Sequence, residues 1–266
     1  MSVFLACLAL LGTCPTLKKT DLTNYKAVYR HIDSLSYQKY LIGKTTQKKP
    51  IYAYKLPSVN HKRTLGVVYG GVHPIEQSTS WFIYSVMSII KKNRLSFDGD
   101  LWFIPILNVD SKNKVWRNKK GYLRHGWRRN SKRVDLNRDA NRKTQLETKV
   151  FQRFILKVKP QIAVDVHQWG NVTHTPKSRS NKRQKYWGRV LTAMMRFAGQ
   201  LRTPYRGVLM TWAQKHGGAD SYLLELGVKT NPLIWTPSLQ KKYCYYPRGF
   251  VRFLKSYDFS RNILRK

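Results

Sequence analysis

The sequence predicts a single α/β domain with a mixed, largely parallel central sheet flanked by helices. Short apolar runs typical of buried strands alternate with longer segments whose apolar residues repeat at helical spacing. The chain has 266 residues, enough for one large core, and no stretch rich in proline, glycine and serine divides it. Hydrophobic residues make up 42% of the chain, as in ordinary globular proteins.

The elements are expected in the following order. The predicted strands are residues 51–56, 64–69, 101–106, 162–166 and 221–226. The predicted helices are residues 21–33, with Asp21 as N-cap, then 77–92, 145–157 and 186–202. Ligand sites in such sheets gather at the carboxyl ends of the strands, so polar residues that follow these strands should share one site.

The chain is strongly basic, with 50 lysine and arginine residues, 13 acidic residues and a formal net charge of +37. Such a charge favours polyanionic surroundings, such as nucleic acid, an anionic membrane or wall polymer, or an acidic substrate. A solvated basic surface without a functional partner explains the composition equally well.

The N-terminus is an apolar run, residues 2–14, too short to span a bilayer and of suitable length for the core of a signal peptide. We predict that residues 1–16 are a signal peptide or lipoprotein leader and that residues 17–266 form the functional domain. No lysine or arginine precedes the run, and without export the protein would be cytoplasmic. No transmembrane span is expected.

Two cysteines bear on this leader. The segment ending in Cys14 loosely resembles a lipoprotein cleavage box, which would make Cys14 a lipid anchor. If the leader is removed, Cys244 is the only thiol certain to remain, so no network of intramolecular disulfides is expected.

A candidate metal site begins where the strand at residues 64–69 ends in two glycines and is followed by His73 and Glu76. Their spacing allows an imidazole nitrogen and a carboxylate oxygen to reach one divalent ion. A third ligand is available in His167, which ends the next buried strand, and Glu225 near the end of a further strand is a candidate general base. A catalytic zinc site needs three protein ligands and one open position.

Each of these signals is weak alone, because His-x-x-Glu arises by chance and a histidine at a strand end is usually structural. Glutamate, however, occurs only at Glu76, Glu147 and Glu225. Two of the three lie at the ends of apolar runs, where a carboxylate is costly to bury unless a cation or hydrogen bonds compensate it. This scarcity favours a functional site.

The long basic segment at residues 108–143 contains Arg128-Arg129-Asn130 and Asp135-Leu136-Asn137-Arg138. A loop of this length inside a compact domain is usually functional. With the histidines and glutamates above, these motifs resemble the zinc metallocarboxypeptidases of the carboxypeptidase A type, across roughly residues 65–227. The compact layout is most similar to bacterial members that act on peptidoglycan peptides.

The resemblance implies a role for each matching residue. His73, Glu76 and His167 would bind Zn²⁺, Glu225 would be general base and acid, and Arg128 would stabilise the oxyanion, with Arg117 and Arg129 as competitors for that role. Asn137 and Arg138 would hold a substrate carboxylate, an interaction that suits a planar guanidinium. Tyr205 is the candidate for the family's active-site tyrosine, and Met210 for the floor of the specificity pocket.

The sequence also departs from the family. Asp139-Ala140 replaces the usual asparagine and aromatic residue after Asp-Leu-Asn-Arg, which is expected to loosen or recharge that subsite. The His-Pro-x-Glu form is shared with the cytosolic carboxypeptidases that trim polyglutamate.

The expected function is that of an exported zinc metallocarboxypeptidase that hydrolyses a C-terminal or γ-D-glutamyl amide bond of an anionic peptide, such as a peptidoglycan stem peptide. Its partners would be a peptide with a free carboxylate and an anionic cell-wall polymer, with nucleic acid not expected as a specific partner. The alternatives are a deglutamylating carboxypeptidase with Arg206 or Lys215 as side-chain reader, an acylamino-acid deacylase of the aspartoacylase type, and a catalytically inactive polyanion-binding protein.

Overall fold

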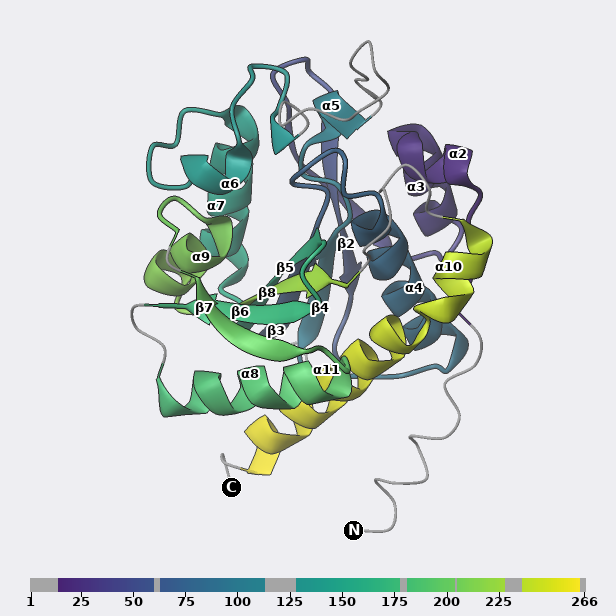
Figure 1. Ribbon diagram of the computed structural model, residues 1–266, viewed down its shortest axis with the longest axis vertical. Coiled ribbons are helices and arrows are strands. Elements are labelled where there is room, and N and C mark those ends of the chain that lie inside the picture. Colours follow the sequence, from purple (N-terminus) through teal and green to yellow (C-terminus); the bar gives the residue numbers. More distant parts are fainter. Residues whose placement is uncertain are drawn as a thin grey trace.

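The computed structural model describes residues 14–59, 63–112, 128–177, 181–203, 205–227 and 236–263. These residues form one eight-stranded sheet with helices packed on both faces (Figure 1). The prediction of a mixed, largely parallel sheet flanked by helices is confirmed.

The strands follow the order β1-β2-β4-β3-β5-β8-β6-β7 across the sheet. Their bounds are β1 (Gln38–Lys44), β2 (Pro50–Leu56), β3 (Thr64–Tyr69), β4 (Asp100–Ile104), β5 (Ile162–Gln168), β6 (Val172–Pro176), β7 (Gly199–Thr203) and β8 (Asp220–Leu226). The central strands β4, β3, β5 and β8 run parallel, as do β6 and β7. The pairs β1-β2, β2-β4 and β6-β8 are antiparallel.

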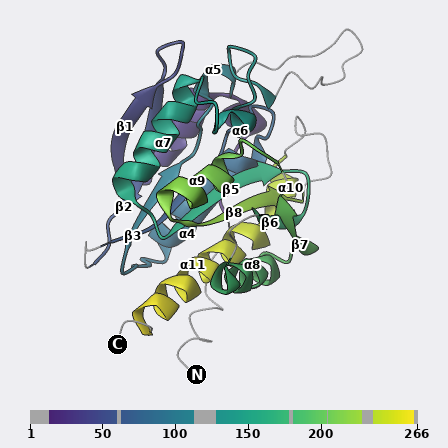
Figure 2. The same ribbon diagram turned by 90° about the vertical axis from the view of Figure 1, so that its left-hand side faces the viewer.

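The helices form two layers (Figures 1 and 2). On one face α7 (Leu146–Val158) contacts β1, and α9 (Leu209–Gly217) contacts β5 and β8. On the other face α4 (Ser78–Lys92) contacts β5, α8 (Lys182–Met194) contacts β6 to β8, and α11 (Tyr245–Ile263) packs on α4 and α8. The shorter helices are α2 (Lys19–Thr23), α3 (Tyr25–Asp33), α5 (Val109–Lys112), α6 (Leu136–Asp139) and α10 (Pro237–Lys242).

The middle of the sheet explains the apolar runs in the sequence. All seven residues of β5 are buried, because helices cover both of its faces. A strand covered on both faces loses the alternation of polar and apolar residues and becomes a nearly continuous apolar run. Polar residues that interrupt such a run, here Asp165 and His167, therefore need partners inside the protein.

All five predicted strands are present, and the helices predicted at residues 77–92 and 145–157 are confirmed as α4 and α7. The first predicted helix is divided into α2 and α3 at Asn24, whose side chain caps α3, so Asp21 is not an N-cap. The helix predicted to continue to residue 202 ends at Met194 and is followed by β7. Strands β1 and β6 and helices α9, α10 and α11 were not predicted.

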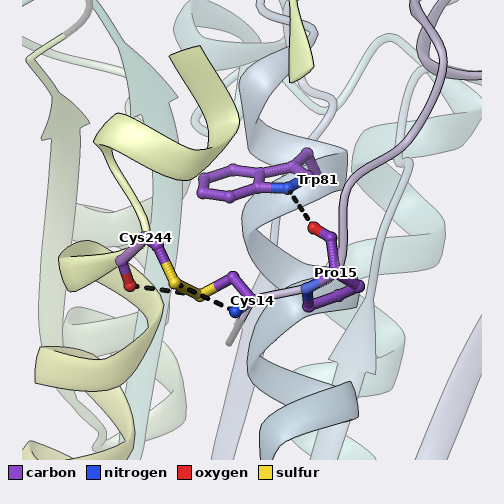
Figure 3. The surroundings of a disulfide bond; sticks show 4 residues. All are labelled: Cys14, Pro15, Trp81 and Cys244. Carbon is purple, nitrogen blue, oxygen red and sulfur yellow. Dashed lines mark hydrogen bonds between the residues drawn. A yellow bond between two sulfur atoms is a disulfide. The ribbon is translucent and has the colours of Figure 1, made fainter. Parts of the chain in front are cut away.

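Cys14 and Cys244 form a disulfide, so the expectation that no disulfide holds the fold is wrong (Figure 3). The bond joins residues 230 positions apart. The segment after Cys14 packs into the same region: the Trp81 indole donates to the Pro15 carbonyl at 3.0 Å, and the Leu17 backbone exchanges two hydrogen bonds with the buried Gln240 side chain. The positions of the two cysteines along the chain do not predict this disulfide, because the cysteines meet only when the helices pack together.

This packing bears on two expectations about the N-terminus. A sulfur that is bonded to Cys244 does not carry a lipid, so Cys14 is not a lipid anchor in this structure. Cys14 is tied to Cys244 and Pro15 to α4, and the boundary expected after residue 16 stays a prediction. Residues 1–13 lie outside the described residues, and their removal as a leader stays a prediction.

Within the described parts of the chain, no helix combines the length and the apolar character needed to cross a bilayer.

Candidate metal centre and adjoining arginine cavity

The first two candidate ligands lie in the turn that links β3 to α4. Gly71 begins this turn with φ of +60°, and a Cβ there would lie 2.9 Å from the backbone of Ile106, so a side chain would not fit. The turn is closed by a hydrogen bond from the Glu76 amide to the His73 carbonyl. His73 and Glu76 are thereby directed toward one another, and both are buried.

His73, Glu76 and His167 converge, although His167 comes from the end of β5, more than 90 positions along the chain. Nδ1 of His73 lies 2.8 Å from one Glu76 oxygen, and Nδ1 of His167 lies 2.8 Å from the other. The two Nδ1 atoms are 3.1 Å apart. A ligand atom from each residue lies within 4.8 Å of the others, so one small cation could contact all three.

The other ring nitrogens of the two histidines face acceptors that orient the rings. Nε2 of His73 lies 3.1 Å from Asp135, and Nε2 of His167 lies 3.0 Å from Asp165. A carboxylate at Nε2 favours the tautomer with its proton there, which leaves Nδ1 free to bind a metal. Each histidine therefore has a carboxylate beside its outer ring nitrogen, as is typical of metal ligands, with a hydrogen bond at His73 and a close ion-pair distance at His167.

Electrostatics inside the metal-free cluster are strong. Burial disfavours charge on His73, but the Glu76 charge and the hydrogen bonds of Asp135 and Glu76 raise its pKa above the usual value. Burial also opposes ionisation of Glu76, yet the two histidines outweigh it and lower the pKa of Glu76. The cluster therefore holds an ionised carboxylate between two imidazoles, and a divalent cation with the same three ligands would satisfy that charge.

Glu225 lies beside this cluster. It is the register partner of His167 across the parallel pair β5-β8, so the two side chains come from neighbouring positions of adjacent strands. Burial raises the pKa of Glu225 to about 7, and one of its carboxylate oxygens is buried without a hydrogen-bond partner among the described residues. A carboxylate with a pKa near neutrality is well suited to accept and return a proton.

A cavity of about 940 Å³ adjoins the cluster. Six arginines and two aspartates contribute to its lining: Arg128, Arg129, Arg133, Arg138, Arg142 and Arg206, with Asp135 and Asp139. Asp135 links the two regions, because it hydrogen-bonds His73 with one oxygen and lies 3.5 Å from the Arg128 Nε atom with the other. The cavity is therefore a cationic space beside the candidate metal centre.

Two buried side chains hold the loops that form the cavity wall. The Asn130 side-chain Oδ1 accepts hydrogen bonds from the backbone amides of Lys132 and Val134, and its Nδ2 donates to Gln145 and Glu147. Asn130 thus ties the turn that presents Arg133 to the start of α7.

Asp139 performs the same task for the next loop. Its carboxylate accepts from the Thr144 hydroxyl and from the amides of Thr144 and Gln145, which lowers its pKa against the opposing effect of burial. Asp139 therefore stabilises its own loop while lining the cavity, and its expected effect on the subsite stays a prediction.

The predicted substrate residues fall into different environments. Arg128 and Arg138 line the cavity, and the Arg138 guanidinium lies 4.5 Å from the centre of the Tyr205 ring, which is itself exposed. Asn137 is buried: its side-chain Nδ2 lies 3.2 Å from Nε2 of His167, and its Oδ1 accepts from the Leu209 backbone amide. Asn137 here links the metal centre to α9, and its contact with substrate stays a prediction.

The structure does not bring Met210 to this site. Met210 is fully buried against Val208 and Leu223 and is not among the residues that line the cavity, so it is not the floor of that space. Lys215 is exposed on α9 and does not line the cavity either. Arg117, one competitor for the oxyanion role, lies outside the described residues, and Arg129 lines the cavity with Arg128.

Several residues of the site were not predicted, although some left a trace in the sequence. Asp135 and Asp165 are acids in a chain with only 13 acidic residues, and each lies within or beside a motif that contains a predicted ligand. Because acidic residues are scarce in this chain, their positions beside the predicted ligands indicate a role for both. Arg133 and Arg142 could not have been separated from the other surface arginines by sequence.

Comparison with known proteins identifies the fold. No protein-family model matches the sequence, and no curated protein matches it at a significant level. Solved structures do match. A metallo-carboxypeptidase from Burkholderia cenocepacia aligns over 89% of this chain and 69% of its own, with a TM-score of 0.72 and 11% identity.

Two further structures support the same conclusion. Carboxypeptidase A from Helicoverpa armigera aligns over 97% of this chain and 79% of its own, with a TM-score of 0.70 and 14% identity. The murein-tripeptide amidase from Escherichia coli O157 aligns over 80% of this chain and 91% of its own, with a TM-score of 0.56 and 16% identity. The chain has the fold of the metallo-carboxypeptidases, and the resemblance drawn from the motifs is confirmed at this level.

Proposed function

We propose that the protein is a zinc-dependent metallocarboxypeptidase that hydrolyses a C-terminal or γ-D-glutamyl amide bond of an anionic peptide. The observation that carries the proposal is the convergence of His73, Glu76 and His167 beside Glu225 on a metallo-carboxypeptidase fold. Fold similarity alone does not establish an activity, so the argument rests on these side chains.

The donor set fits zinc. Two imidazole nitrogens and one carboxylate are ligands that zinc accepts in catalytic sites, which keep a fourth position open. When bound, zinc polarises a carbonyl group and lowers the pKa of a coordinated water. Within the described residues no other group of three candidate ligands was found, so His73, Glu76 and His167 are the residues that would hold it.

The chain's own residues supply the remaining functions. Glu225 would take up and return the proton. Its raised pKa makes the protonated and the ionised carboxyl group both accessible, and one of its oxygens has no hydrogen-bond partner among the described residues. Arg128 would stabilise developing negative charge on the substrate oxygen. Arg138 would hold the terminal carboxylate, with the Tyr205 ring beneath its guanidinium orienting it.

A peptidoglycan stem peptide is the proposed substrate. The similarity to a murein-tripeptide amidase and the cationic cavity beside the metal centre support this choice. The same cavity also favours a second candidate, a carboxypeptidase that removes glutamate from acidic peptides. Both substrates carry several carboxylates close to the bond that would be cut.

The place of action is proposed to be outside the cytoplasm. The Cys14–Cys244 disulfide supports export, because such bonds form and persist mainly in oxidising compartments. The net charge of +37 supports association with an anionic cell-wall polymer. If the protein is exported, the mature chain should begin before Cys14 and contain no free thiol at Cys14 or Cys244, which intact-mass measurement with and without reduction would show.

The direct test is incubation of zinc-loaded protein with three substrate types and identification of the products by mass. The stem tripeptide L-alanyl-γ-D-glutamyl-diaminopimelate, an α-linked polyglutamyl peptide and an N-acyl amino acid represent the competing activities. Hydrolysis of the N-acyl amino acid alone would indicate a deacylase. Hydrolysis of none of them by zinc-loaded protein would favour an inactive polyanion-binding protein.

A further inference from the structure

Three arginines of the cavity have no assigned role in the proposed reaction. Arg133, Arg142 and Arg206 come from three separate loops, all are exposed, and all line the same space as Arg128 and Arg138. No carboxylate lies within ion-pair distance of these three guanidinium groups in the part of the chain that the structure describes. Their charges are therefore available to a ligand.

The two aspartates of the cavity offset only part of this charge. Asp135 accepts from His73 and from the Asn137 backbone amide and lies 3.5 Å from the Arg128 Nε atom. Asp139 is saturated by the Thr144 and Gln145 donors. Both carboxylates are engaged with the wall, and six arginines against two aspartates leave an excess of positive charge around the space.

The backbone around these arginines is held in place before any ligand binds. Arg133 has φ of +61°, a left-handed conformation that an arginine adopts only when its surroundings stabilise it, and the Asn130 turn supplies that stabilisation. Gly207, next to Arg206, has φ of +73°, and a Cβ there would lie 2.3 Å from the Arg138 carbonyl. The Gly207 carbonyl also accepts from the Ala140 amide, so Arg206 is kept beside the Arg138 segment.

We propose that Arg133, Arg142 and Arg206 form a second anion subsite, which selects substrates that carry an additional carboxylate near the one bound by Arg138. This inference rests on the proposed peptidase function and names its substrate class: peptides with at least two carboxylates close to the scissile bond. Planar guanidinium groups suit this task because each can bind a carboxylate through two parallel hydrogen bonds.

Two sources supply such a pair of carboxylates. One is an α-linked peptide that ends in glutamate, in which the side chain carries the second charge. The other is a γ-D-glutamyl stem peptide, in which the free α-carboxylate of the glutamyl residue and the carboxylates of diaminopimelate lie on either side of the amide bond. The cavity volume of about 940 Å³ is in the range of sites that hold whole small ligands.

The test compares matched substrates on the zinc-loaded full chain. Ala-Ala-Glu and Ala-Ala-Gln have nearly the same shape and differ by one charge, and the stem tripeptide forms a third arm. The parent protein should show a kcat/KM at least about tenfold higher for the Glu-ending peptide or the stem tripeptide than for Ala-Ala-Gln, the factor expected from one charge-assisted interaction. Arg206→Ala and Arg142→Ala should each reduce that preference by about tenfold.

A matched control removes an exposed arginine elsewhere. Arg189 lies on α8 and does not line the cavity, so Arg189→Ala makes the same change in net charge and should preserve the preference. Equal loss of preference in Arg189→Ala and Arg206→Ala would overturn the subsite, since the effect would then come from general surface charge. A parent protein that prefers neither Ala-Ala-Glu nor the stem tripeptide over Ala-Ala-Gln would also overturn it.

A binding measurement separates this inference from the proposed function. Calorimetric titration with Glu-Glu and with Gln-Gln needs no turnover. Tighter binding of Glu-Glu that is weakened in Arg206→Ala and kept in Arg189→Ala would support the subsite even if no peptide is cut, in which case only the peptidase proposal fails. Equal binding of the two dipeptides would overturn the subsite whatever the activity.

Discussion

The candidate metal centre and the arginine cavity lie next to each other but are built differently. The metal centre takes His73, His167 and Glu225 from the ends of β3, β5 and β8, the parallel strands in the middle of the sheet (Figure 1). Its residues are largely buried and contact one another. The cavity takes its arginines from surface loops, and most of them are exposed.

This contrast suggests a division of tasks. The reacting groups need fixed positions and a desolvated environment, which the centre of a sheet provides, because strand register sets the spacing of His167 and Glu225. Substrate selection needs charged groups that remain in contact with solvent, which loops provide. The loops here are still ordered, because Asn130 and Asp139 satisfy their backbone from within.

The largest effect is expected from loss of a metal ligand. The parent protein should carry about one zinc per chain, the stoichiometry of a three-ligand catalytic site, and His73→Ala should lose both the zinc and the activity. Elemental analysis of purified protein measures the metal, and His31→Ala, a change at a histidine remote from the site, serves as control. Equal zinc content in His73→Ala and the parent protein would show that the cluster is not the metal centre.

Loss of the general base should be nearly as severe but leave the metal in place. Glu225→Gln keeps the size of the side chain and removes its ability to take a proton, so kcat should fall by roughly a thousandfold or more while zinc content is unchanged. Stopped assays on the preferred substrate measure the loss. If the variant stays active, the proton acceptor is another group.

A smaller loss is expected at the point where the two regions meet. Arg128→Ala removes the group proposed to stabilise the oxyanion, and kcat should fall by about a hundredfold. Arg129→Ala, its neighbour on the cavity wall, should have a much weaker effect on kcat if Arg128 holds that role. The reverse ranking would assign the oxyanion role to Arg129.

Removal of the Asn130 side chain, which holds a loop of the cavity wall, should lower the stability of the protein. Asn130→Ala leaves the amides of Lys132 and Val134 and the buried Glu147 without their partner, so the free energy of unfolding should fall by about 2 kcal/mol. Lys132→Ala changes an exposed side chain in the same turn and should have little effect. Urea unfolding of the parent protein and the two variants measures the free energy of unfolding of each. An unchanged stability in Asn130→Ala would mean that the loop is held in another way.

The smallest effect concerns the surface charge outside both regions. If the charge of +37 holds the protein on an anionic polymer, binding to purified cell-wall sacculi should weaken steeply between low and physiological salt, as the screening length falls to about 8 Å. Turnover of a small peptide should respond less, because Arg128 and Arg138 act at short range. Polymer binding that is indifferent to salt would favour the interpretation of the charge as a general surface property.

Much of the metal centre could be predicted from the sequence, for a physical reason. Strands β3, β5 and β8 are covered on both faces, so they appear as apolar runs, and a histidine or glutamate at the end of such a run is conspicuous. The edge strand β1 is mostly exposed and mixed in composition, and it was missed for that reason. Strand β7 was mistaken for the end of α8 because its five residues carry no clear alternation.

The local sequence by itself determined the fold class, the order of the central elements and the residue types that could bind a metal, because burial pattern and ligand spacing are local properties. Tertiary structure alone decided which distant residues meet. It joined Cys14 to Cys244, buried Met210 against Val208 and Leu223, placed the Asn137 side chain between His167 and Leu209, and gathered six arginines around one space. Such contacts depend on how helices and loops pack across the sheet. The spacing of two residues along the chain does not predict how far apart they lie in the folded protein.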